Sequence, residues 1–526
     1  MSETVRSATH ALMRELGMTT VFGNPGSTEL RFFKDAPVDF RYVLALQESS
    51  AVAMADGYAQ ATRNAAFVNL HSAVGVGHAL GSIFTAMRNQ TPLVVTAGQQ
   101  SRALLTGEPF LFSEQATELP KPYVKWSVEP ARAADVPAAI ARAYYTAMQP
   151  PQGPTFVSIP EDDWDADADI VTRREVRGDF VGEPEALGAV AAALNDSAHP
   201  ALVVGPGVDR DRAWDLVVAL AERTGATVWV SPLSGRCSFP EDHPAFAGFL
   251  TPARRRLAEQ LAGHDVVVVL GAPVFTYHVR SDGPVVADGT ALFMLTDDPD
   301  AAAFAPVGSA IVTTLRRGIA DLIGRVTPSS RAPSGRGPRA TPPATEPMSG
   351  AFVLHTVRQV MPDDATIVEE APSHRNAMHE HLPIRRSDGF YCGASGGLGW
   401  AMPAAVGLAL ADNERCVVCL VGDGSSLYSI QALWTAAEHQ LPITFVVLNN
   451  RGYSALKAFG LAMGIETLPG VNLPGIEFVN LAIGFGVTAE RVDRAERLAP
   501  ALRESFQTSG PSLFDVWVDA TVERLY

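Results

Sequence analysis

The segment from Val421 to Tyr453 constrains the fold of this chain more than any other. An apolar strand ends in Gly-Asp-Gly, a helical pattern follows, and a second apolar strand ends in Asn449 and Asn450. Strands with this spacing belong to an α/β sheet, and such sheets bind ligands at the carboxyl ends of their strands. The segment therefore predicts an α/β fold with a ligand site beside Asp423.

The side chains at these strand ends suit a divalent metal and a diphosphate. Asp423 offers a carboxylate, Asn450 a carboxamide oxygen and Gly452 a backbone carbonyl, and hard oxygen ligands of this kind suit Mg²⁺ or Ca²⁺. The helix expected to begin at Ser425 and Ser426 would point its amino end at phosphate oxygens. A tight glycine turn in an ordinary strand, turn and helix unit would explain the GDG alone, but the ordered combination favours the metal site.

Composition is that of a large protein with several domains. The chain has 526 residues, which suggests about three domains of ordinary size, and 47% of its residues are hydrophobic. The formal net charge of -16 argues against nucleic acid or an anionic membrane as a partner. The amino-terminal residues lack an apolar signal core and no run approaches a membrane span, so we expect a cytoplasmic protein.

The cysteine pattern does not indicate a metal site. Cys416 and Cys419 form a C-x-x-C, but they lie within the strand that precedes Gly422, where side chains point alternately to opposite faces. No second pair follows at zinc spacing. We interpret both cysteines as core residues.

Two segments divide the chain into three α/β blocks. Residues 327–349 are crowded with Pro, Ser, Gly and Arg and are interpreted as a linker. A softer boundary lies in the charged residues 161–184. We predict three doubly wound parallel-sheet domains, at residues 1–170, 182–326 and 350–526. In the middle block, the turn at Gly205 lacks the spacing of a dinucleotide-binding loop, so we interpret it as a tight turn.

The first block carries further candidate site residues. A turn rich in Gly, Asn and Pro follows a short strand, with Ser27 and Thr28 placed to cap the next helix. A second strand is expected to end at Glu48, where a buried carboxylate needs a partner, and a third ends at His71. Glu48 could instead be a helix-start acid that binds backbone amides, and His71 a core histidine.

Together, these motifs resemble those of the thiamine-diphosphate-dependent decarboxylase and acetolactate synthase superfamily over essentially the whole chain. The resemblance implies a pyrimidine-binding domain, a middle domain and a diphosphate-binding domain, in that order. It also implies thiamine diphosphate with Mg²⁺ or Ca²⁺ as cofactors. Glu48 matches the glutamate that family members hold against the pyrimidine ring nitrogen, where it helps to activate the cofactor.

Within the superfamily, FGNPGS, FVNLHSAVGVG, PLVVTAGQQ, GAPVFTYH and GGLGWAMPAAVGL are similar to segments of the benzoylformate decarboxylases. The resemblance implies non-oxidative decarboxylation of an aromatic 2-oxo acid, benzoylformate to benzaldehyde and CO₂, with some carboligase activity. Mandelate breakdown is the pathway that the family analogy suggests. Ser27 would bind the substrate carboxylate, while His71 and His278 would serve the proton transfers.

The same resemblance implies which residues contact the cofactor. Leu398 would be the apolar wedge that bends it, and a backbone carbonyl of the GGLG turn would accept from its amino group. The complete expected set is Asn24, Pro25, Gly26, Glu48, Gly396, Gly397, Leu398, Gly422, Asp423, Gly424, Ser425, Tyr428, Asn450, Gly452 and Tyr453.

The substrate pocket is expected to be apolar, which would suit a phenyl ring. Ordinary packing near a cofactor would give the same composition. Two features of the sequence differ from the family pattern: a bulkier segment at Pro109 and Phe112, and EEAPSHRNAM at Glu369 in place of a Ser/Thr-rich segment. Both differences affect the expected size of the substrate, and not the expected chemistry. The expected pocket residues are Ser27, His71, Phe110, Leu111, Leu456 and Phe459, with Phe112, Ala455 and Leu461 as further candidates.

Other members of the superfamily fit less well. Pyruvate and indolepyruvate decarboxylases carry adjacent histidines where this chain has only His71, and acetolactate synthases bind FAD through the middle domain. A benzaldehyde-lyase-type carboligase would use the same residues, whereas a non-catalytic relative would have lost Glu48 or the GDG turn. The family holds its cofactor between subunits, so we expect a homo-oligomer, at least a dimer and commonly a tetramer.

Overall fold

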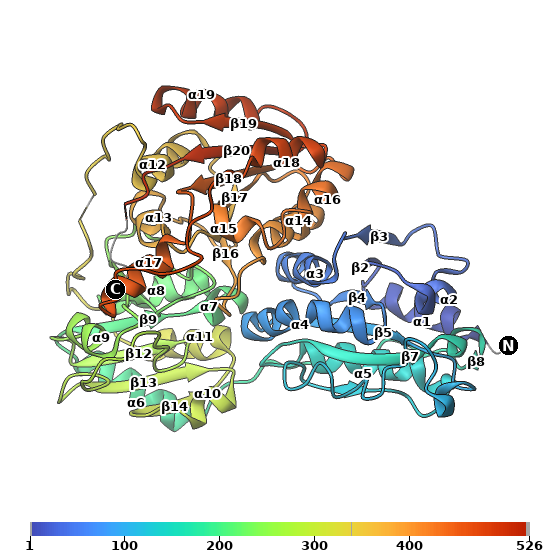
Figure 1. Ribbon diagram of the computed structural model, residues 1–526. Coiled ribbons are helices and arrows are strands. Elements are labelled where there is room, and N and C mark those ends of the chain that lie inside the picture. The colour runs from blue at the N-terminus through green and yellow to red at the C-terminus, as the bar shows by residue number, and fades with distance from the viewer. Residues whose placement is uncertain (1–2, 338, 522–526) are drawn as a thin grey trace.

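Three α/β domains make up the computed structural model, which describes residues 3–337 and 339–521 (Figure 1). The outer ends of the first and third predicted domains and residue 338 of the predicted linker lie outside the described residues. Each domain contains one six-stranded sheet in which all strand pairs are parallel. Helices flank each sheet. The prediction of three doubly wound parallel-sheet domains is confirmed.

In the first domain, the chain changes direction across the sheet between β2 and β4, and α/β sheets bind ligands at such a switch point. In spatial order, its strands are β3 (Arg41–Leu44), β2 (Thr20–Gly23), β4 (Ala66–Leu70), β5 (Leu93–Gln99), β7 (Thr155–Pro160) and β6 (Ser127–Val128). Its helices are α1 (Val5–Glu15), α2 (Leu30–Phe33), α3 (Glu48–Thr62), α4 (Ser72–Asn89) and α5 (Val136–Met148). A small antiparallel pair joins β1 (Glu3–Thr4) to β8 (Asp167–Ala168).

The third domain repeats this strand order, with its switch point between β15 and β17. Its strands, in spatial order, are β16 (Phe390–Cys392), β15 (Thr366–Glu370), β17 (Val417–Gly422), β18 (Ile443–Asn449), β20 (Ser512–Trp517) and β19 (Thr488–Val492). Its helices are α12 (Gly350–Val360), α13 (Arg375–His381), α14 (Ala401–Ala411), α15 (Asp423–Ser426), α16 (Ala432–Glu438), α17 (Ser454–Ala462), α18 (Phe478–Gly484) and α19 (Ala495–Ser505).

The middle domain has a different strand order, which in its own numbering is 3-2-1-4-5-6, an order common among dinucleotide-binding folds. The strands are β11 (Phe246–Phe249), β10 (Thr227–Val230), β9 (Pro200–Val204), β12 (Val266–Leu270), β13 (Ala291–Thr296) and β14 (Ser309–Val312). The helices are α6 (Pro184–Asp196), α7 (Pro206–Arg210), α8 (Trp214–Thr224), α9 (Arg254–Gln260), α10 (Pro299–Ala303) and α11 (Leu315–Arg325).

Gly205 lies in a tight turn that leads into α7, since its carbonyl oxygen accepts from Val208 N at 3.1 Å. An added Cβ on Gly205 would lie 2.3 Å from the Cβ of Ala272. One detail of the local structure differs from the sequence predictions. The single helix expected from Ser425 is broken: α15 ends at Ser426 and α16 begins at Ala432. Hydrogen bonds between residues three apart replace the α-helical pattern after α15.

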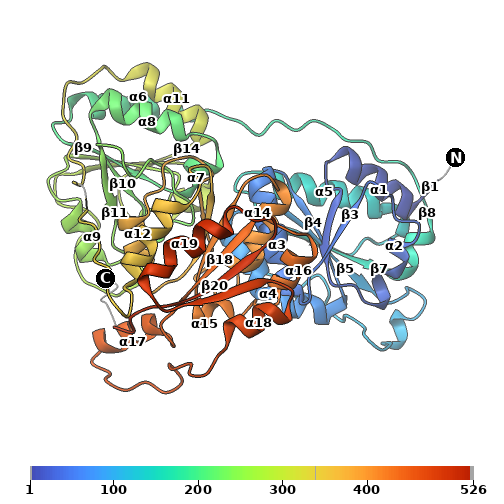
Figure 2. The ribbon, with the colours of Figure 1, turned by 90° about the horizontal axis from the view of Figure 1, so that it is seen from above.

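Extended segments connect the domains. Residues 169–183 run from the first domain to the middle domain without a helix or strand (Figure 2). Between α11 and α12, the Pro-rich segment lies along the middle domain, where the backbone N–H of Arg336 donates to Phe246 O at 2.8 Å. The exact domain boundaries stay predictions. No helix in the described ranges is long and apolar enough to cross a membrane.

A shared core joins the first and third domains. Helices α3 and α14 pack against each other, and the core includes Val52 and Ala55 from α3 and Ala404 and Ala405 from α14. A buried hydrogen bond accompanies this contact, since Trp400 Nε1 donates to Asp56 Oδ2 at 2.7 Å. The packing fixes the relative placement of the two domains that carry the candidate site residues.

Candidate functional site

Asp423 is the first residue of α15, directly after β17 at the switch point of the third domain. Its Oδ1 accepts from the N–H of Gly424 at 2.7 Å and its Oδ2 from the N–H of Gly452 at 2.8 Å. Burial raises the pKa of Asp423, because taking a carboxylate out of water disfavours its ionised form. A bound cation would remove that penalty.

Asn450 supplies an oxygen suited to the same cation. Its Oδ1 is buried and has no hydrogen-bond partner among the described residues. The neighbouring Asn449 is engaged, because its Nδ2 donates to Asp515 Oδ1 at 2.7 Å and its Oδ1 accepts from Arg451 N. A carboxylate, an unpaired carboxamide oxygen and the Gly452 carbonyl form a hard oxygen set that fits Mg²⁺ or Ca²⁺.

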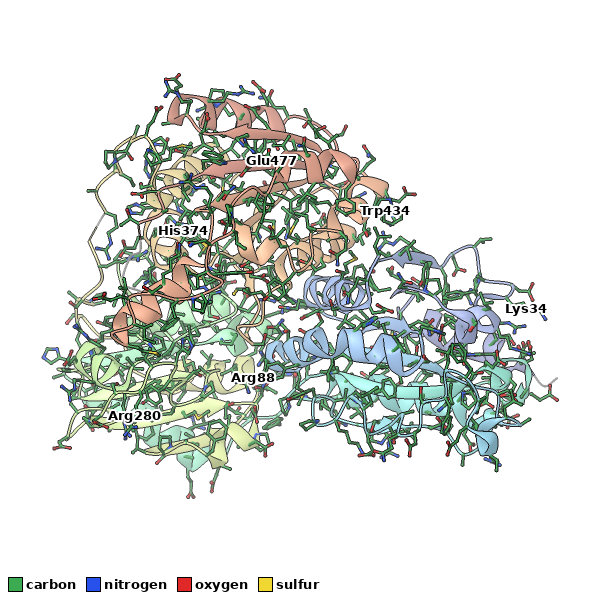
Figure 3. All side chains as sticks on the ribbon, in the orientation of Figure 1. Lys34, Arg88, Arg280, His374, Trp434 and Glu477 are labelled. Carbon is green, nitrogen blue, oxygen red and sulfur yellow. The ribbon has the colours of Figure 1, made fainter. Side chains whose placement is uncertain are left out.

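A small polar cavity of about 40 Å³ adjoins Asn450, and it is lined in part by His374 and Ser454. In the described part of the chain, His374 Nε2 and Ser454 Oγ are buried without partners, as is Asn450 Oδ1. Burial lowers the pKa of His374, which precedes α13 in the third domain (Figure 3), to about 4 and keeps the ring neutral. The sequence drew attention to EEAPSHRNAM only for substrate size, so His374 was missed as a candidate polar contact.

Two glycines of the third domain allow close contact with tyrosines. A Cβ on Gly424 would lie 2.3 Å from Tyr453 Cε1, and a Cβ on Gly399 would lie 2.8 Å from Tyr428 Cβ. Gly399 also has a φ of +98°, which favours glycine. The expected contact residues Tyr428 and Tyr453 therefore lie against the GGLG turn and the GDG turn.

The GGLG turn is held by a carboxylate that the sequence prediction did not include. Glu370, the last residue of β15, accepts backbone N–H groups from Gly399 at 2.6 Å, Trp400 at 2.8 Å and Ala401 at 2.9 Å. Burial raises its pKa to about 7 against these hydrogen bonds, which lower it. The position of Glu370 at the end of a buried strand could have identified it. In the turn itself, Gly396 and Gly397 are exposed and Leu398 is half-buried.

Glu48 lies at the start of α3, four residues after β3 ends at Leu44, so the prediction that it ends a strand is wrong. The helix is capped by Gln47, whose Oε1 accepts from Ser49 N at 2.8 Å and from Ser50 N at 3.2 Å. Since Gln47 caps the helix, the Glu48 carboxylate is not needed for capping and can contact other groups. Its Oε2 lies 3.0 Å from His78 Nδ1, a contact that the sequence prediction did not include.

The turn after β2 also differs from its prediction. Ser27 and Thr28 do not cap a helix: Gly26 is the N-cap of a 3₁₀ turn, and its N–H donates to Glu29 Oε2 at 2.8 Å. Asn24 is half-buried and its Nδ2 donates to a backbone carbonyl, while Pro25 and Ser27 are exposed. The side chain that accepts a backbone N–H in this turn is therefore the buried carboxylate of Glu29, and not the hydroxyl of Ser27 or Thr28.

His71 precedes α4 and meets this turn. Its Nδ1 lies 3.0 Å from Glu29 Oε2 and 3.1 Å from Thr28 Oγ1. Glu29 is buried and was missed by the sequence prediction, although a glutamate three residues after a Gly cap is a recognisable helix-start pattern. His71 is thus held by a carboxylate and is not an isolated core histidine.

The expected pocket residues fall into two groups. His278, exposed in a loop of the middle domain, packs edge-on against Phe459 of α17 with ring centroids 5.0 Å apart. Leu456 on the same helix is 52% exposed, whereas Phe110 in the first domain is 89% exposed. Leu111, half-buried, adopts a positive φ. The structure brings His278 and Phe459 together, while Phe110 lies at an open surface.

The candidate residues form two half-sites. One lies in the first domain around Glu48 and His71, and the other in the third domain around Asp423 and Asn450. Across the described residues, no hydrogen bond or ion pair joins the first pair to the second. Each half-site lies beside the switch point of its own sheet, where ligand binding is expected.

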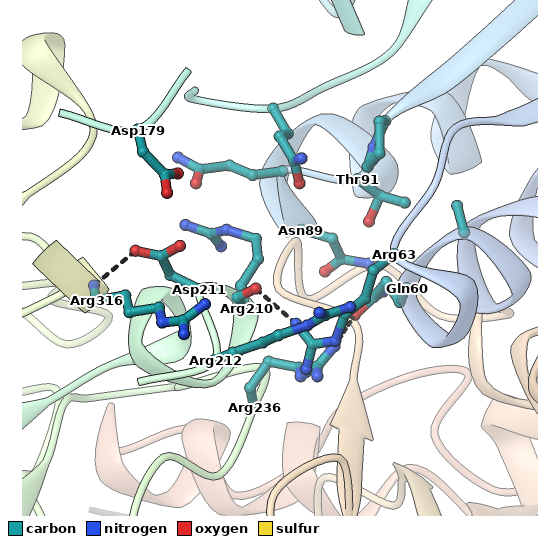
Figure 4. Close-up of a pocket in the computed structure, with 14 residues that line it drawn as sticks. Gln60, Arg63, Asn89, Thr91, Asp179, Arg210, Asp211, Arg212, Arg236 and Arg316 are labelled. Atoms are coloured by element: carbon teal, nitrogen blue, oxygen red, sulfur yellow. Dashed lines mark hydrogen bonds between the residues drawn. The ribbon is translucent and has the colours of Figure 1, made fainter. Parts of the chain in front are cut away.

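A cavity of about 220 Å³ lies elsewhere, at the junction of the first and middle domains (Figure 4). None of the candidate site residues lines it. Two of its arginines are paired with Asp388 of the third domain: Arg63 Nη2 lies 2.8 Å and Arg236 Nη2 lies 2.5 Å from Asp388 Oδ1. These ion pairs connect the third domain to the first and middle domains.

Comparison with known proteins finds relatives that match almost the whole chain. Three family models match successive parts: "Thiamine pyrophosphate enzyme, N-terminal TPP binding domain" at residues 3–117, the central domain at 187–312 and the C-terminal TPP binding domain at 371–516. A Pseudomonas aeruginosa protein named benzoylformate decarboxylase is 41% identical over 522 residues, or 98% of each chain.

Solved structures give the same result. The crystal structure of benzoylformate decarboxylase from Polynucleobacter necessarius has a TM-score of 0.97 at 40% identity, and it covers 99% of this chain and 100% of that one. The thiamine diphosphate-dependent 4-hydroxybenzoylformate decarboxylase of Rhodococcus jostii has a TM-score of 0.96 at 40% identity, with the same coverage. The chain therefore belongs to the thiamine pyrophosphate enzyme family and, within it, to the benzoylformate decarboxylase group.

Proposed function

We propose that the chain is a carboxy-lyase that uses thiamine diphosphate to convert an aromatic 2-oxo acid, benzoylformate or a ring-substituted relative, into an aldehyde and CO₂. The observation that carries this proposal is the full-length similarity to proteins named benzoylformate decarboxylase and 4-hydroxybenzoylformate decarboxylase. The intact Glu48 and Asp423 support an active enzyme over a non-catalytic relative.

The third domain would hold the diphosphate end of the cofactor. Asp423, Asn450 and the Gly452 carbonyl would bind Mg²⁺ or Ca²⁺, which in turn binds phosphate oxygens. The unpaired Asn450 Oδ1 and the buried Asp423 carboxylate support this assignment. The GGLG turn, held by Glu370, would present Leu398 and a backbone carbonyl to the aminopyrimidine end.

The first domain would act on the reactive end. When bound, thiamine diphosphate supplies attack on the 2-oxo carbon and a sink for the electrons released with CO₂. Glu48 would hydrogen-bond the pyrimidine nitrogen, and Ser27 would bind the substrate carboxylate. His71 and His278 would move protons at the carbonyl carbon of the product and at its oxygen, since imidazole suits proton transfer near neutral pH.

An apolar pocket would favour decarboxylation, because a charged carboxylate becomes neutral CO₂ there. Phe459 and Leu456 beside His278 are its candidate walls, and they suit an aromatic ring. Phe110 and Leu111 belong to the first domain. They would line the same pocket as Phe459 and Leu456 only if the first domain of another copy packs against the third domain of this one. Carboligation of two aldehydes is a second activity that the same residues could support.

The division into half-sites supports a homo-oligomer, in which the first domain of one copy faces the third domain of another. The outward face of α4, next to Glu48, exposes Val74 to 52% and carries Gly77 and Gly81 with open space around them. A second copy could pack closely on this face. A dimer is the minimum, and the tetramer, the cytoplasmic location and the mandelate pathway stay predictions.

A panel of 2-oxo acids tests the function. We expect kcat/KM for benzoylformate or 4-hydroxybenzoylformate to exceed that for pyruvate by at least about 100-fold, since an aryl ring buries far more apolar surface than a methyl group. Aldehyde release is measured for each acid with thiamine diphosphate and Mg²⁺ present. Equal values for aryl and alkyl acids would remove the aromatic assignment, and a ketol product without free aldehyde would favour the carboligase.

A further inference from the structure

Glu29 is a buried carboxylate in the turn after β2 of the first domain. It follows β2, its side chain is 1% exposed, and His71, which follows the adjacent strand β4, lies beside it. Four groups surround its two oxygens. Such a carboxylate is costly to bury unless every oxygen is hydrogen-bonded, and here the donors account for both of them.

The donors can be assigned one by one. Oε1 accepts from Thr28 Oγ1 at 2.6 Å and from the N–H of Gly98 at 3.1 Å, and Oε2 accepts from the N–H of Gly26 at 2.8 Å. The hydroxyl of Thr28 has only one proton, which is committed to Glu29. Thr28 therefore cannot also donate to His71.

This assignment fixes the proton on His71. Both atoms within reach of His71 Nδ1, Glu29 Oε2 at 3.0 Å and Thr28 Oγ1 at 3.1 Å, can only accept there. Nδ1 must consequently be the nitrogen that carries hydrogen. The Nε2 atom is left with its lone pair when the ring is neutral, and all hydrogen bonds of the ring to other described residues are made through Nδ1.

Two glycines hold this arrangement in place. A Cβ on Gly26 would lie 2.1 Å from His71 Nδ1, so the ring rests directly on the Gly26 backbone. A Cβ on Gly98 would lie 2.3 Å from Glu29 Oε1. The imidazole thus has a close neighbour at its Nδ1 edge and the carboxylate has one at Oε1, which restricts rotation of either group.

We propose that Glu29 is a positioning residue that fixes His71 in the Nδ1–H form and so makes Nε2 the only nitrogen that exchanges protons with the substrate. In each exchange, Nε2 gives one proton to the oxygen of the former ketone or to the carbon that has lost CO₂, or takes one back from that oxygen. Glu29 keeps its charge and stabilises the imidazolium between the two events. The proton-transfer role rests on the proposed function, whereas the assignment of the Nδ1 proton does not.

The first measurement uses the wild-type protein. Selective ¹⁵N-histidine labelling and long-range ¹H–¹⁵N spectra, recorded at a pH where the ¹⁵N shifts show a neutral ring, report which ring nitrogen carries hydrogen. The His71 signals are identified by their loss in His71→Asn. We expect a protonated Nδ1 and an unprotonated Nε2. A protonated Nε2 in the neutral ring would overturn the proposal without any variant of Glu29.

The second measurement uses Glu29→Gln, which keeps the shape but introduces an NH₂ group that can donate to Nδ1. We expect the His71 proton to move to Nε2 in a substantial fraction of the molecules. On the holoenzyme with benzoylformate, we expect kcat to fall at least about 100-fold while KM changes less than about 3-fold, as for other catalytic histidines held in the wrong tautomer.

The chain offers a matched control. Glu241 and His379 form a second buried pair, with His379 Nδ1 2.8 Å from Glu241 Oε1, outside both half-sites. Glu241→Gln removes the same charge from the same kind of pair and should leave the His71 spectrum and kcat close to wild type. An equal fall of kcat in both variants would assign Glu29 a merely structural role.

The outcomes separate the two proposals. A wild-type spectrum and wild-type kcat in Glu29→Gln would overturn the positioning role. The tautomer could shift as expected in Glu29→Gln while neither wild type nor Glu29→Gln acts on any aryl 2-oxo acid. In that case the proton assignment holds and the proposed substrate class fails. A tautomer shift with unchanged kcat would contradict the claim that Nε2 of His71 transfers the proton.

Discussion

At the scale of single residues, the structure separates groups that stabilise the fold from groups left available for chemistry. Gln47 caps α3, so the adjacent Glu48 is not needed for that purpose. Asn449 is bonded to Asp515, whereas the Oδ1 of Asn450 is unpaired. In both pairs, one residue stabilises the fold through its hydrogen bonds, and its neighbour is left available to bind a ligand.

Glu48→Gln tests the carboxylate assigned to the cofactor. Gln keeps the size and one oxygen but cannot take the ionised form, so we expect kcat to fall by about 10²–10⁴, the usual range for loss of a general acid or base. The cofactor is expected to bind still, because the metal site of the third domain is unchanged. Steady-state kinetics and a cofactor titration check both statements, and wild-type kcat would contradict the role of Glu48.

Glu370 makes stability depend on pH. Burial raises its pKa to about 7 from the usual 4.5, so the folded protein keeps a proton that the unfolded chain has released. The stability from this group is present below about pH 4.5 and is lost as the pH rises through about 7. Relative to Glu370→Gln, wild type should lose up to about 3 kcal/mol of unfolding free energy over this window. Unfolding curves of both proteins at several pH values measure the difference, and parallel pH profiles would contradict it.

At the scale of elements, the contact between α3 and α14 depends on two glycines. A Cβ on Gly57 would lie 2.3 Å from the carbonyl oxygen of Ala404, and a Cβ on Gly407 would lie 1.9 Å from that of Met54. Side chains at either position would separate the helices. The glycines therefore set the distance between the first and third domains.

Gly407→Ala is expected to destabilise this helix pair. The new methyl group meets backbone that cannot rotate away, so we expect a loss of about 1–3 kcal/mol, as for other overpacked cores. Gly324→Ala in α11 is the control, because nothing lies within 4 Å of its added Cβ. Alanine favours a helix by up to about 1 kcal/mol there. Thermal unfolding of the two variants should shift in opposite directions, and a stable Gly407→Ala would contradict the packing argument.

At the scale of the whole molecule, the first and third sheets share one strand order, and each presents a half-site at its switch point. The middle sheet has another order and contributes His278 through a loop. We propose that these half-sites belong to one site, although no hydrogen bond or ion pair joins their residues within the described part of the chain. Association of two copies is the simplest arrangement that would complete it.

Cofactor binding should stabilise the assembled protein. A ligand that binds only the folded state adds about 2.7 kcal/mol at 100 times its Kd, so thiamine diphosphate with Mg²⁺ should raise Tm and chelation should reverse the rise. Asp423→Asn should lose most of the Mg²⁺-dependent rise, because the metal would lose its only carboxylate among the assigned ligands. Thermal scans with and without EDTA measure this, and an undiminished rise in Asp423→Asn would contradict the metal assignment.

Light scattering tests the association of copies. We expect a dimer or a larger even assembly, since the proposed site would combine domains of two chains. Val74, Gly77 and Gly81 on the outward face of α4 would then be covered. Gly77→Arg should dissociate the assembly because a long charged side chain cannot fit a close helix contact. Full activity in a monomer would overturn the division of the site between copies.

The sequence by itself determined the three parallel-sheet domains and the strand ends that carry Asp423, Asn450 and His71. Apolar runs, glycine turns and polar strand ends are local, and local spacing encodes them directly. The sequence was least reliable at helix starts, where Gln47 and Gly26 took the capping positions expected of their neighbours. Any of several adjacent polar residues can cap a helix, and only the backbone geometry selects one.

Only the tertiary structure decided which strand ends meet. Glu29 reaches His71 because β2 lies beside β4 although β3 comes between them in the chain, and Glu370 reaches the GGLG turn because β15 lies beside β16, the strand that leads into this turn. Strand order arises from how helices pack on both faces of a sheet, which depends on contacts between distant segments. For this reason, the partners that hold the histidine and the cofactor turn were absent from the prediction, while the residues they hold were present.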